Sequence, residues 1–268
     1  MLFRSLMDDL GSALSADPAP LMLGGGNPAH VPEVQALARR RMMEILDRPG
    51  EFERLIGNYD TPQGAAPFLE ALADMLNREY GWGIGRENIA LTNGSQNAFV
   101  SLFNLFAGRF EGSRKKQIML PLTPEYIGYT EVGLESDFFL ARRPKIESLE
   151  APFFKYRIDF DDLHISREVG ALCLSRPTNP TGNVATDEEV EKLRTLARRA
   201  GVPLILDNAY GAPFPSIIQS EVTPVWDEDI VLCLSLSKFG LPTLRTGIVR
   251  SEEHTSELQS PCNLVCRL

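Results

Sequence analysis

The stretch TDEEVEKLRTLARRAGVPLILD, residues 186–207, decides the fold class of this protein. Thr186 is a natural helix N-cap, and Glu189 three residues later completes a capping box, in which each side chain accepts the backbone N–H of the other residue. Gly201 then ends the helix, because glycine readily adopts the left-handed conformation that helix C-termini favour. An apolar run that begins two residues later and ends at Asp207 is typical of a buried strand. The stretch therefore predicts a helix at 187–200 followed by a strand at 203–207.

The same alternation of helical and strand-like patterns continues along most of the chain. The strand-like runs are short, apolar and bounded by turn residues, as expected for strands that helices cover on both faces. This pattern predicts an α/β fold, with a mostly parallel seven-stranded sheet inside a three-layer α/β/α domain. The predicted strands are 89–92, 117–121, 136–141, 171–175, 203–207, 230–234 and a seventh that starts at 245–249, and the other predicted helices are 33–46, 65–80 and 95–107.

The bulk composition of the 268-residue chain is that of a globular protein, with 43% hydrophobic and 24% charged residues. Its formal net charge of −9 would repel a phosphate backbone, which argues against nucleic acid as a partner. No apolar run reaches the roughly 18 residues of a membrane span, and the N-terminus lacks the apolar core of a signal peptide. The four cysteines suggest no disulfide framework, and Cys173 and Cys233 lie in apolar runs where they are expected to be buried. These features predict a reduced, cytoplasmic protein that binds neither nucleic acid nor a membrane.

Polar loops follow five of the predicted strands. Ligands of parallel sheets bind at the carboxyl ends of the strands, so these loops outline a single site. The loops are 93–96, 121–126, 176–182, 207–211 and 235–238.

Lys238 is the candidate nucleophile of this site. A lysine after a strand is ordinarily a solvated surface residue, but one that is partly desolvated near a cation loses its proton readily and forms an imine with an aldehyde. Arg245 is a candidate for that cation, and Ser235 and Ser237 offer hydroxyl groups suited to a phosphate.

Asp207 ends a buried strand, where a carboxylate costs free energy unless it is paired. It either caps a helix or makes a salt bridge, or it pairs with a protonated pyridine nitrogen and keeps such a ring electron-poor. Tyr210 and Asn179 could both bond a phenolate oxygen of the same ring, although Asn179 is also a common turn residue before proline.

The segment Asn93–Gln96 begins a helix directly after a strand, and helix N-termini bind phosphate. Ser95 would serve equally well as a simple helix cap. Tyr126 could stack on a planar cofactor or pack in the core.

Three ordered motifs resemble those of a known family. SLSKFGLPTLRTG at 235–247 is similar to the lysine signature of the class I and II aminotransferases, which are fold-type I pyridoxal-phosphate enzymes. RPTNPTG at 176–182 resembles their asparagine loop, and LDNAYG at 206–211 resembles their aspartate–tyrosine strand. The resemblance runs from about residue 21 to residue 249, with Thr243 standing where the family more commonly has glycine.

This resemblance implies pyridoxal 5′-phosphate as the cofactor and no metal. It implies that Lys238 bonds to the cofactor and moves the substrate proton, that Asp207 pairs with the ring nitrogen, and that Tyr210 and Asn179 hold the phenolate oxygen. The other implied contacts are Gly94, Ser95, Gln96, Ser235, Ser237 and Arg245 on the phosphate, Tyr126 on the ring, Tyr59 on the phosphate of the neighbouring subunit in a homodimer, and Gly25, Gly26 and Asn27 at the substrate carboxylate.

Within the family, four further segments are most similar to transaminases that exchange an amino group between valine or alanine and a 2-oxo acid such as pyruvate. The segments are LGGGNP at 23–28, NYDTPQG at 58–64, PEYIGY at 124–129 and SKFGLP at 237–242. The alternatives are another fold-type I enzyme, such as a carbon–sulfur lyase or a cyclopropane-forming synthase, and a non-enzymatic regulator. The regulator is disfavoured because the chain is acidic and shows no basic N-terminal DNA-binding segment.

The chain turns abruptly polar at Arg250, where its last strand should stay apolar. The segment RSEEHTSELQSP at 250–261 resembles the translated read-through of a sequencing-library adapter, and the alternative is a polar surface loop or helix. We expect 1–50 to belong to a small domain and a substrate-site loop, 51–249 to be an incomplete cofactor-binding large domain, and 250–268 to be a non-native tail. Because the family's carboxylate-binding arginine lies in the C-terminal small domain, this fragment is expected to lack transaminase activity.

Overall fold

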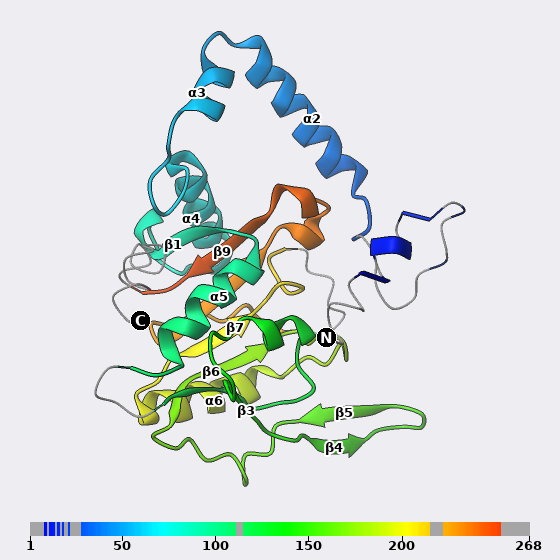
Figure 1. Ribbon diagram of the computed structural model, residues 1–268, viewed down its shortest axis with the longest axis vertical. Coiled ribbons are helices and arrows are strands. Elements are labelled where there is room, and N and C mark those ends of the chain that lie inside the picture. The colour runs from blue at the N-terminus through cyan, green and yellow to red at the C-terminus, as the bar shows by residue number, and fades with distance from the viewer. Residues whose placement is uncertain are drawn as a thin grey trace.

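A seven-stranded sheet forms the centre of the computed structural model, which describes residues 8–9, 11–13, 15–16, 18, 21, 28–110, 115–214 and 222–252 (Figure 1). The strand order is β1-β9-β8-β7-β6-β2-β3. The bounds are β1 Ile89–Asn93, β2 Gln117–Leu120, β3 Phe139–Ala141, β6 Val169–Ser175, β7 Leu204–Asp207, β8 Ile230–Ser235 and β9 Thr246–Arg250.

Only the pairs that β9 makes in this sheet are antiparallel, so the predicted mostly parallel seven-stranded sheet is confirmed. The connection from β8 to β9 explains the exception. It spans residues 236–245, and a parallel crossover needs about a dozen residues or more. The chain therefore turns back on itself, and β9 lies between β8 and the early strand β1.

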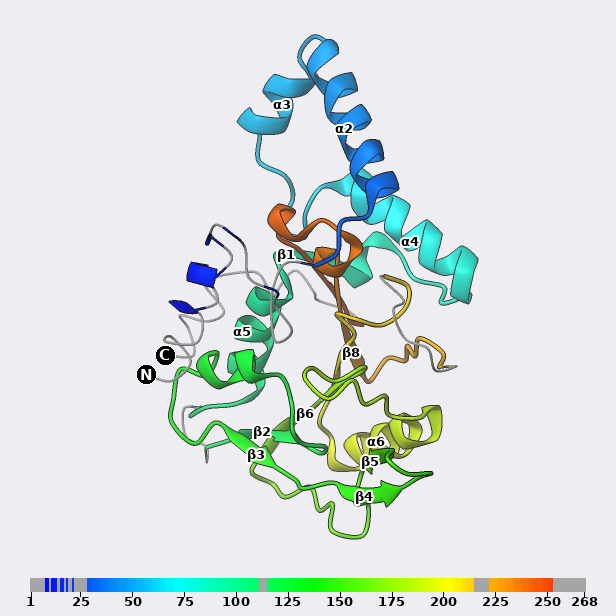
Figure 2. The same cartoon turned by 90° about the vertical axis from the view of Figure 1, so that its right-hand side faces the viewer.

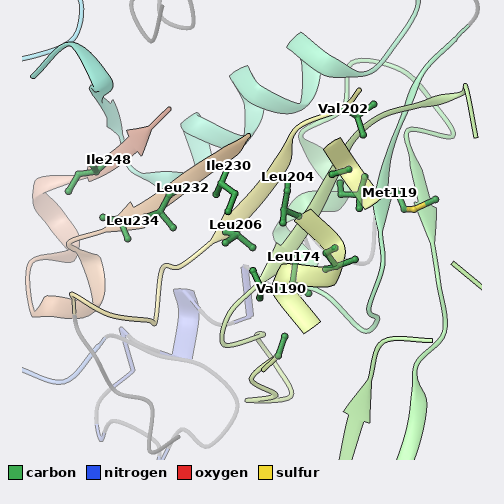
Figure 3. Packing of buried hydrophobic residues seen from close by; sticks show 14 of the residues in the cluster. Met119, Leu174, Val190, Val202, Leu204, Leu206, Ile230, Leu232, Leu234 and Ile248 are labelled. Atoms are coloured by element: carbon green, nitrogen blue, oxygen red, sulfur yellow. The ribbon is translucent and has the colours of Figure 1, made fainter. Parts of the chain in front are cut away.

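Helices cover both faces of the sheet, which confirms the three layers (Figure 2). Helix α5 (Ser95–Phe106) packs on one face, where its buried side chains meet Ala171, Cys173 and Cys233. Helices α4 (Ala66–Tyr80) and α6 (Asp187–Ala200) pack on the other face. Figure 3 shows this second layer, in which Val190 of α6 lies against alternate residues of the strands. The alternation follows from the two-residue period of a strand.

Helix α6 forms as its local sequence predicts. The backbone N–H of Glu189 donates to Thr186 Oγ1 at 3.2 Å, and the backbone N–H of Thr186 donates to Glu189 Oε2 at 2.9 Å. Gly201 ends the helix with a φ of 67°. These bonds satisfy donors at the helix start, and a cap of this kind stabilises a helix by about 1 kcal/mol.

Other elements differ from the expected pattern. The hairpin β4 (Lys145–Ser148) and β5 (Phe154–Arg157) was not predicted, because β4 is exposed throughout and has no apolar alternation. The strand expected at 136–141 shortens to β3, since Asp137 has a φ of 51°. The remaining elements are α2 Pro32–Asp47, α3 Glu51–Gly57 and the short 3₁₀ turns η1 Arg86–Asn88, η2 Ile127–Glu131, η3 Ser237–Phe239 and η4 Pro242–Leu244.

Helices α2 and α3 project away from the sheet and bury no residue of their own (Figures 1 and 2). Cys173 and Cys233 are buried and unpaired, as expected. Among the residues that the structure describes, no helix has the length and apolarity needed to cross a bilayer. Of the segment expected to be a non-native tail, residues 253–268 lie outside the described residues.

Candidate active site

Strands β6, β7 and β8 carry the polar residues of the site at their carboxyl ends. Asp207, the last residue of β7, is the register partner of Ser175 on β6 and of Cys233 on β8. Ser235 ends β8 next to them. The parallel register brings these ends to one edge of the sheet, so residues far apart in sequence become neighbours.

Asp207 is buried, with 7% of its surface exposed, and it is hydrogen-bonded on both carboxylate oxygens. The Tyr129 hydroxyl donates to its Oδ2 at 2.5 Å, and the backbone N–H of Ala209 donates to its Oδ1 at 3.0 Å. Burial raises the pKa of Asp207, and these two hydrogen bonds oppose that rise by stabilising the anion. Neither bond is a helix cap or a salt bridge, so a positively charged partner for Asp207 has to come from a ligand or from outside these contacts.

Lys238, Tyr210 and Asn179 lie in the loops that follow β8, β7 and β6, and their side chains come together there. The Asn179 amide donates to the Tyr210 hydroxyl at 3.1 Å. Lys238 Nζ lies 5.0 Å from the centre of the Tyr210 ring, a distance at which a cation is attracted to an aromatic face. The structure therefore places three of the predicted cofactor residues in one group.

A second group gathers around the start of α5. Gly94 has a φ of 86°, and a β-carbon there would lie 2.2 Å from Arg245 Nη2. Arg245 Nη1 in turn donates to Ser237 Oγ at 3.4 Å. A side chain at position 94 would fill this cradle, which joins a guanidinium, a hydroxyl and the backbone of a helix N-terminus.

The start of α5 has no side-chain cap. Gly94 occupies the N-cap position, so the alternative interpretation of Ser95 as the cap is wrong. Gly247 on β9 packs closely against it, since a β-carbon at 247 would lie 2.5 Å from the backbone nitrogen of Ser95. Uncapped N–H groups at a helix start attract an anion.

The other predicted phosphate residues take part in the framework of the same site. Ser235 is buried, and its hydroxyl accepts the backbone N–H of Ser237 at 3.2 Å. The Gln96 amide donates to the backbone oxygen of Gly128 at 2.7 Å, so this side chain ties α5 to η2.

Tyr126 borders both groups. Burial raises the pKa of Tyr126, Tyr210 and Asp207 raise it further, and Arg245 opposes them. These interactions show that the phenol lies within electrostatic reach of the aspartate, the second tyrosine and the arginine.

Some predicted residues are not brought into the site. Tyr59 is fully exposed. Gly25, Gly26 and Asn27 lie outside the described residues.

The sequence motifs did not point to three residues near Asp207, one of which contacts it directly while the other two are linked to it through further hydrogen bonds. They are Tyr129, Ser175 and Glu125, whose carboxylate accepts the backbone N–H of Ser175 at 2.8 Å and the Ser175 hydroxyl. The motif PEYIGY drew attention only to Tyr126, although a 3₁₀ turn has three residues per turn and would place Tyr129 on the same side. No local signal marks Ser175, since it ends a strand like any small polar residue.

The residues present fit pyridoxal phosphate. The site offers an anion cradle at Gly94 and Arg245, an amine at Lys238 directly after Ser237, and a buried carboxylate at Asp207. Pyridoxal phosphate has a phosphate for the anion cradle, a basic ring nitrogen for the Asp207 carboxylate and an aldehyde for the Lys238 amine.

Comparisons with known proteins agree with this geometry. The family model for class I and II aminotransferases matches residues 53–260. Valine–pyruvate aminotransferase of Escherichia coli K12 is 54% identical over 248 residues, which cover 92% of this chain and 59% of that protein. A Psychrobacter arcticum 273-4 protein assigned to the amino-acid aminotransferases has a solved structure with a TM-score of 0.89 and 48% identity, covering 97% of this chain and 64% of that one. The crystal structure of valine–pyruvate aminotransferase from Salmonella typhimurium LT2 has a TM-score of 0.82 and 47% identity over the same shares. The chain thus spans less than two thirds of each of these relatives.

Proposed function

This chain belongs to the class I and II aminotransferase family, whose members use pyridoxal phosphate, and from that premise we propose that the intact protein transfers an amino group between valine or alanine and a 2-oxo acid such as pyruvate. The observation that carries the proposal is that Lys238, the Asn179–Tyr210 pair, Asp207 and the anion cradle all lie at the same edge of the sheet, with Tyr126 interacting with Tyr210, Asp207 and Arg245. The identity with the E. coli valine–pyruvate aminotransferase supports the substrate class.

Pyridoxal phosphate supplies, when bound, an aldehyde for the amino group and an electron-poor ring for the electron pair at the substrate Cα. Arg245, Ser237 and the free N–H groups at the start of α5 would hold its phosphate. Tyr210 and Asn179 would hold its phenolate oxygen, and the Tyr126 phenol would lie against its ring.

Asp207 would hold a proton on the ring nitrogen. A carboxylate buried in a low-dielectric site interacts strongly with a cation, so the pairing would stabilise the protonated ring. The Tyr129 hydroxyl and the Ala209 N–H keep the carboxylate oriented and ionised for that task.

Lys238 would bond to the cofactor and then carry the proton that leaves the substrate Cα. The short η3 turn holds it directly after β8, beside the Tyr210 ring. A proton carrier must be positioned within hydrogen-bond reach of the reacting atom, and a backbone turn fixed to the sheet limits where the amine can go.

The first test locates the cofactor on the chain. Reduction of the protein with borohydride in the presence of pyridoxal phosphate, followed by peptide mapping, is expected to label Lys238. A label on another lysine would contradict the assignment, and Lys192, which lies over the Phe160 ring at 5.3 Å, serves as an internal control for nonspecific reaction.

The second test identifies the reaction. The intact protein incubated with valine and pyruvate is expected to produce alanine at a rate that Lys238→Ala abolishes. Release of pyruvate from cysteine without any transfer would instead indicate a carbon–sulfur lyase, and ring closure of a suitable amino acid would indicate the synthase.

We also propose that the intact protein is a cytoplasmic homodimer in which Tyr59 reaches the phosphate of the neighbouring subunit. Its full exposure supports a role away from its own site. The exposed apolar side chains of α2 and α3 support a surface that another part of the assembly covers; they are Leu37, Met42, Met43, Leu46, Leu55 and Ile56. Sedimentation of the intact protein should show a dimer, and a fully active monomer would refute this.

The proposed division places 1–50 with the small domain, 51–249 in the large domain and 250–268 in a non-native tail. The projection of α2 from the sheet supports the first boundary. The poor fit of Arg250 supports the boundary at residue 250. This residue is fully buried at the end of β9, and none of its three side-chain nitrogens has a hydrogen-bond partner. Resequencing of the source locus tests that boundary.

A further inference from the structure

A second carboxyl group, that of Glu125, is connected to Asp207 through the hydroxyl groups of Ser175 and Tyr129. The proposed reaction makes no use of it. The Glu125 carboxylate accepts two hydrogen bonds from Ser175, one from its backbone N–H at 2.8 Å and one from its hydroxyl. Ser175 Oγ lies 3.2 Å from the Tyr129 hydroxyl, which donates to Asp207 Oδ2 at 2.5 Å. Four side chains thus form an unbroken row from Glu125 to Asp207.

The fold assembles this row from four separate segments. Glu125 follows β2, Tyr129 belongs to η2, Ser175 ends β6, and Asp207 ends β7. Ser175, Tyr129 and Asp207 expose 3%, 2% and 7% of their surfaces, so water does not compete for the hydrogen bonds among these three, whereas Glu125 is half-buried. Hydrogen bonds in such surroundings are strong, and an unpaired charge there is costly.

The two carboxyl groups oppose each other's ionisation. Burial raises the pKa of Glu125 to about 7, the bonds from Ser175 and from the backbone N–H of Tyr126 at 3.2 Å oppose that rise, and the charge of Asp207 adds to it. The other titratable groups facing Glu125 are Tyr129 and Cys173, and both stay neutral because burial raises the pKa of each well above its ordinary value. The pair therefore carries its first negative charge more readily than its second.

Asp207 is the better place for that first charge. It has a phenol and a backbone N–H as donors, and a ring nitrogen would be its third partner. A proton on Glu125 removes the repulsion that a second buried anion would exert on Asp207.

The Ser175 hydroxyl has one proton and two possible acceptors, which links the two carboxyl groups further. When Glu125 is ionised, this proton points to its carboxylate. When Glu125 is protonated, it donates to Ser175 Oγ, and the Ser175 proton is then free to point at the Tyr129 oxygen. A phenol that accepts one hydrogen bond donates a stronger one, so Tyr129 would hold the Asp207 anion more firmly.

We propose that Glu125 is a positioning residue that holds a proton behind Asp207 and, through Ser175 and Tyr129, keeps the negative charge of the pair on Asp207. The part of this inference that concerns the cofactor rests on the proposed function. The part that concerns the proton on Glu125 depends only on the chain itself.

The cofactor-free protein tests the proton directly. Infrared spectra at pH 6 are expected to contain a band from a protonated carboxylic acid that disappears as the pH rises through about 7. The band should be absent from Glu125→Gln, whose amide has the shape of the protonated acid. Glu189→Gln provides the matched control, since Glu189 is a buried glutamate that caps α6 away from the site. A spectrum of Glu125→Gln identical to that of the wild type would overturn the proposal.

The loaded protein tests the coupling. The absorbance of bound pyridoxal phosphate should change with a midpoint near pH 7 in the wild type, and this step should be missing in Glu125→Gln. Tyr129→Phe should keep the infrared band of Glu125 but lose the absorbance step, because the connection to Asp207 is cut. If the absorbance step is unchanged in both variants, the proposed coupling of Glu125 to Asp207 through Ser175 and Tyr129 is wrong. Should Glu125→Gln fail to fold, Ser175→Ala interrupts the same row and must abolish the step.

The two sets of measurements separate this inference from the proposed function. An intact protein that transfers no amino group but shows the Glu125 band would contradict the function alone. A transaminase that lacks both the band and the step would contradict this inference alone.

Discussion

Gly94 shows how a single missing β-carbon shapes the site. Its φ of 86° suits glycine, and the space that a side chain would take is occupied by the Arg245 guanidinium. The sequence alone suggested a phosphate-binding helix start at this position, and the contact with Arg245 shows that a larger residue would have to displace this guanidinium.

Gly94→Ala is expected to weaken the binding of pyridoxal phosphate by about 10- to 100-fold, because it displaces one charge-assisted contact worth about 1.5–3 kcal/mol. A fluorescence titration of the cofactor-free protein measures this effect. Gly81→Ala is the matched control, since Gly81 also has a positive φ, of 66°, but has nothing within 4 Å of the added carbon. The control should lose stability and keep its affinity, and an equal loss of affinity in both variants would refute the cradle.

Asp207→Ala is expected to reduce turnover in the intact protein on the order of 10²-fold or more, because a pre-positioned charge at the reacting group is lost. The affinity for the cofactor should fall much less, since the phosphate contacts at Arg245 and Ser237 remain. Steady-state kinetics beside a binding titration separates the two effects. Wild-type turnover in this variant would exclude the pairing of Asp207 with the ring nitrogen.

At the scale of elements, β9 is the strand whose residues fit their surroundings least well. Thr246–Val249 packs between β1 and β8, but Arg250 follows in the same strand with its charge buried. Its guanidinium stacks over the Trp226 ring at 3.2 Å, and burial lowers its pKa to about 9. An apolar residue would suit this position better, which is the physical basis for proposing that the native sequence stops before it.

Arg250→Leu is expected to raise the free energy of unfolding by about 2 kcal/mol, because the unsatisfied buried donors each cost about 1–3 kcal/mol while the desolvated cation–π contact with Trp226 returns about 2 kcal/mol. Urea unfolding of the two proteins measures the difference. Arg86→Leu is the control, because Arg86 forms an exposed ion pair with Glu70 whose loss should change stability by less than about 1 kcal/mol. A destabilised Arg250→Leu would show that the arginine has a partner that compensates its burial.

For the whole molecule, the hydrogen-bonded carboxyl groups of Glu125 and Asp207 make stability depend on pH. The folded protein binds a proton at Glu125 up to about pH 7, whereas the unfolded chain releases it near its ordinary value of 4.5. A raised pKa in the folded state means that the stabilisation is complete below the lower value and is lost as the pH rises through the higher one.

The free energy of unfolding is therefore expected to fall by on the order of 3 kcal/mol between pH 4.5 and pH 7 through this one group. Glu125→Gln cannot ionise, so the difference in stability between the variant and the wild type should move in favour of the variant across that window. Urea titrations at several pH values provide the measurement, with Glu189→Gln as the control. A difference that stays constant with pH would mean that Glu125 keeps an ordinary pKa in the folded protein.

The alternation of helices and strands could be predicted from the sequence because it depends on local patterns. Helix α6 begins and ends where its cap residues Thr186 and Gly201 place it, and the buried strands β6, β7 and β8 follow from short apolar runs. The order of the site residues along the chain also indicated one shared edge of the sheet, since strand ends in a parallel sheet meet there.

Other features were decided only by the tertiary structure, because they depend on contacts between distant parts of the chain. The short connection after β8 explains why β9 is antiparallel, but nothing local shows that β9 lies beside β1, and the exposed β4–β5 hairpin has no apolar pattern to reveal it. The bond from Tyr129 to Asp207 joins residues 78 positions apart, and the register of β6 with β7 sets Ser175 beside them. The sequence by itself determined which residues could carry the chemistry. Only the tertiary structure decided which of these side chains are hydrogen-bonded to one another. Burial and the distances between charged groups set their pKa values, and both are fixed only when the chain has folded.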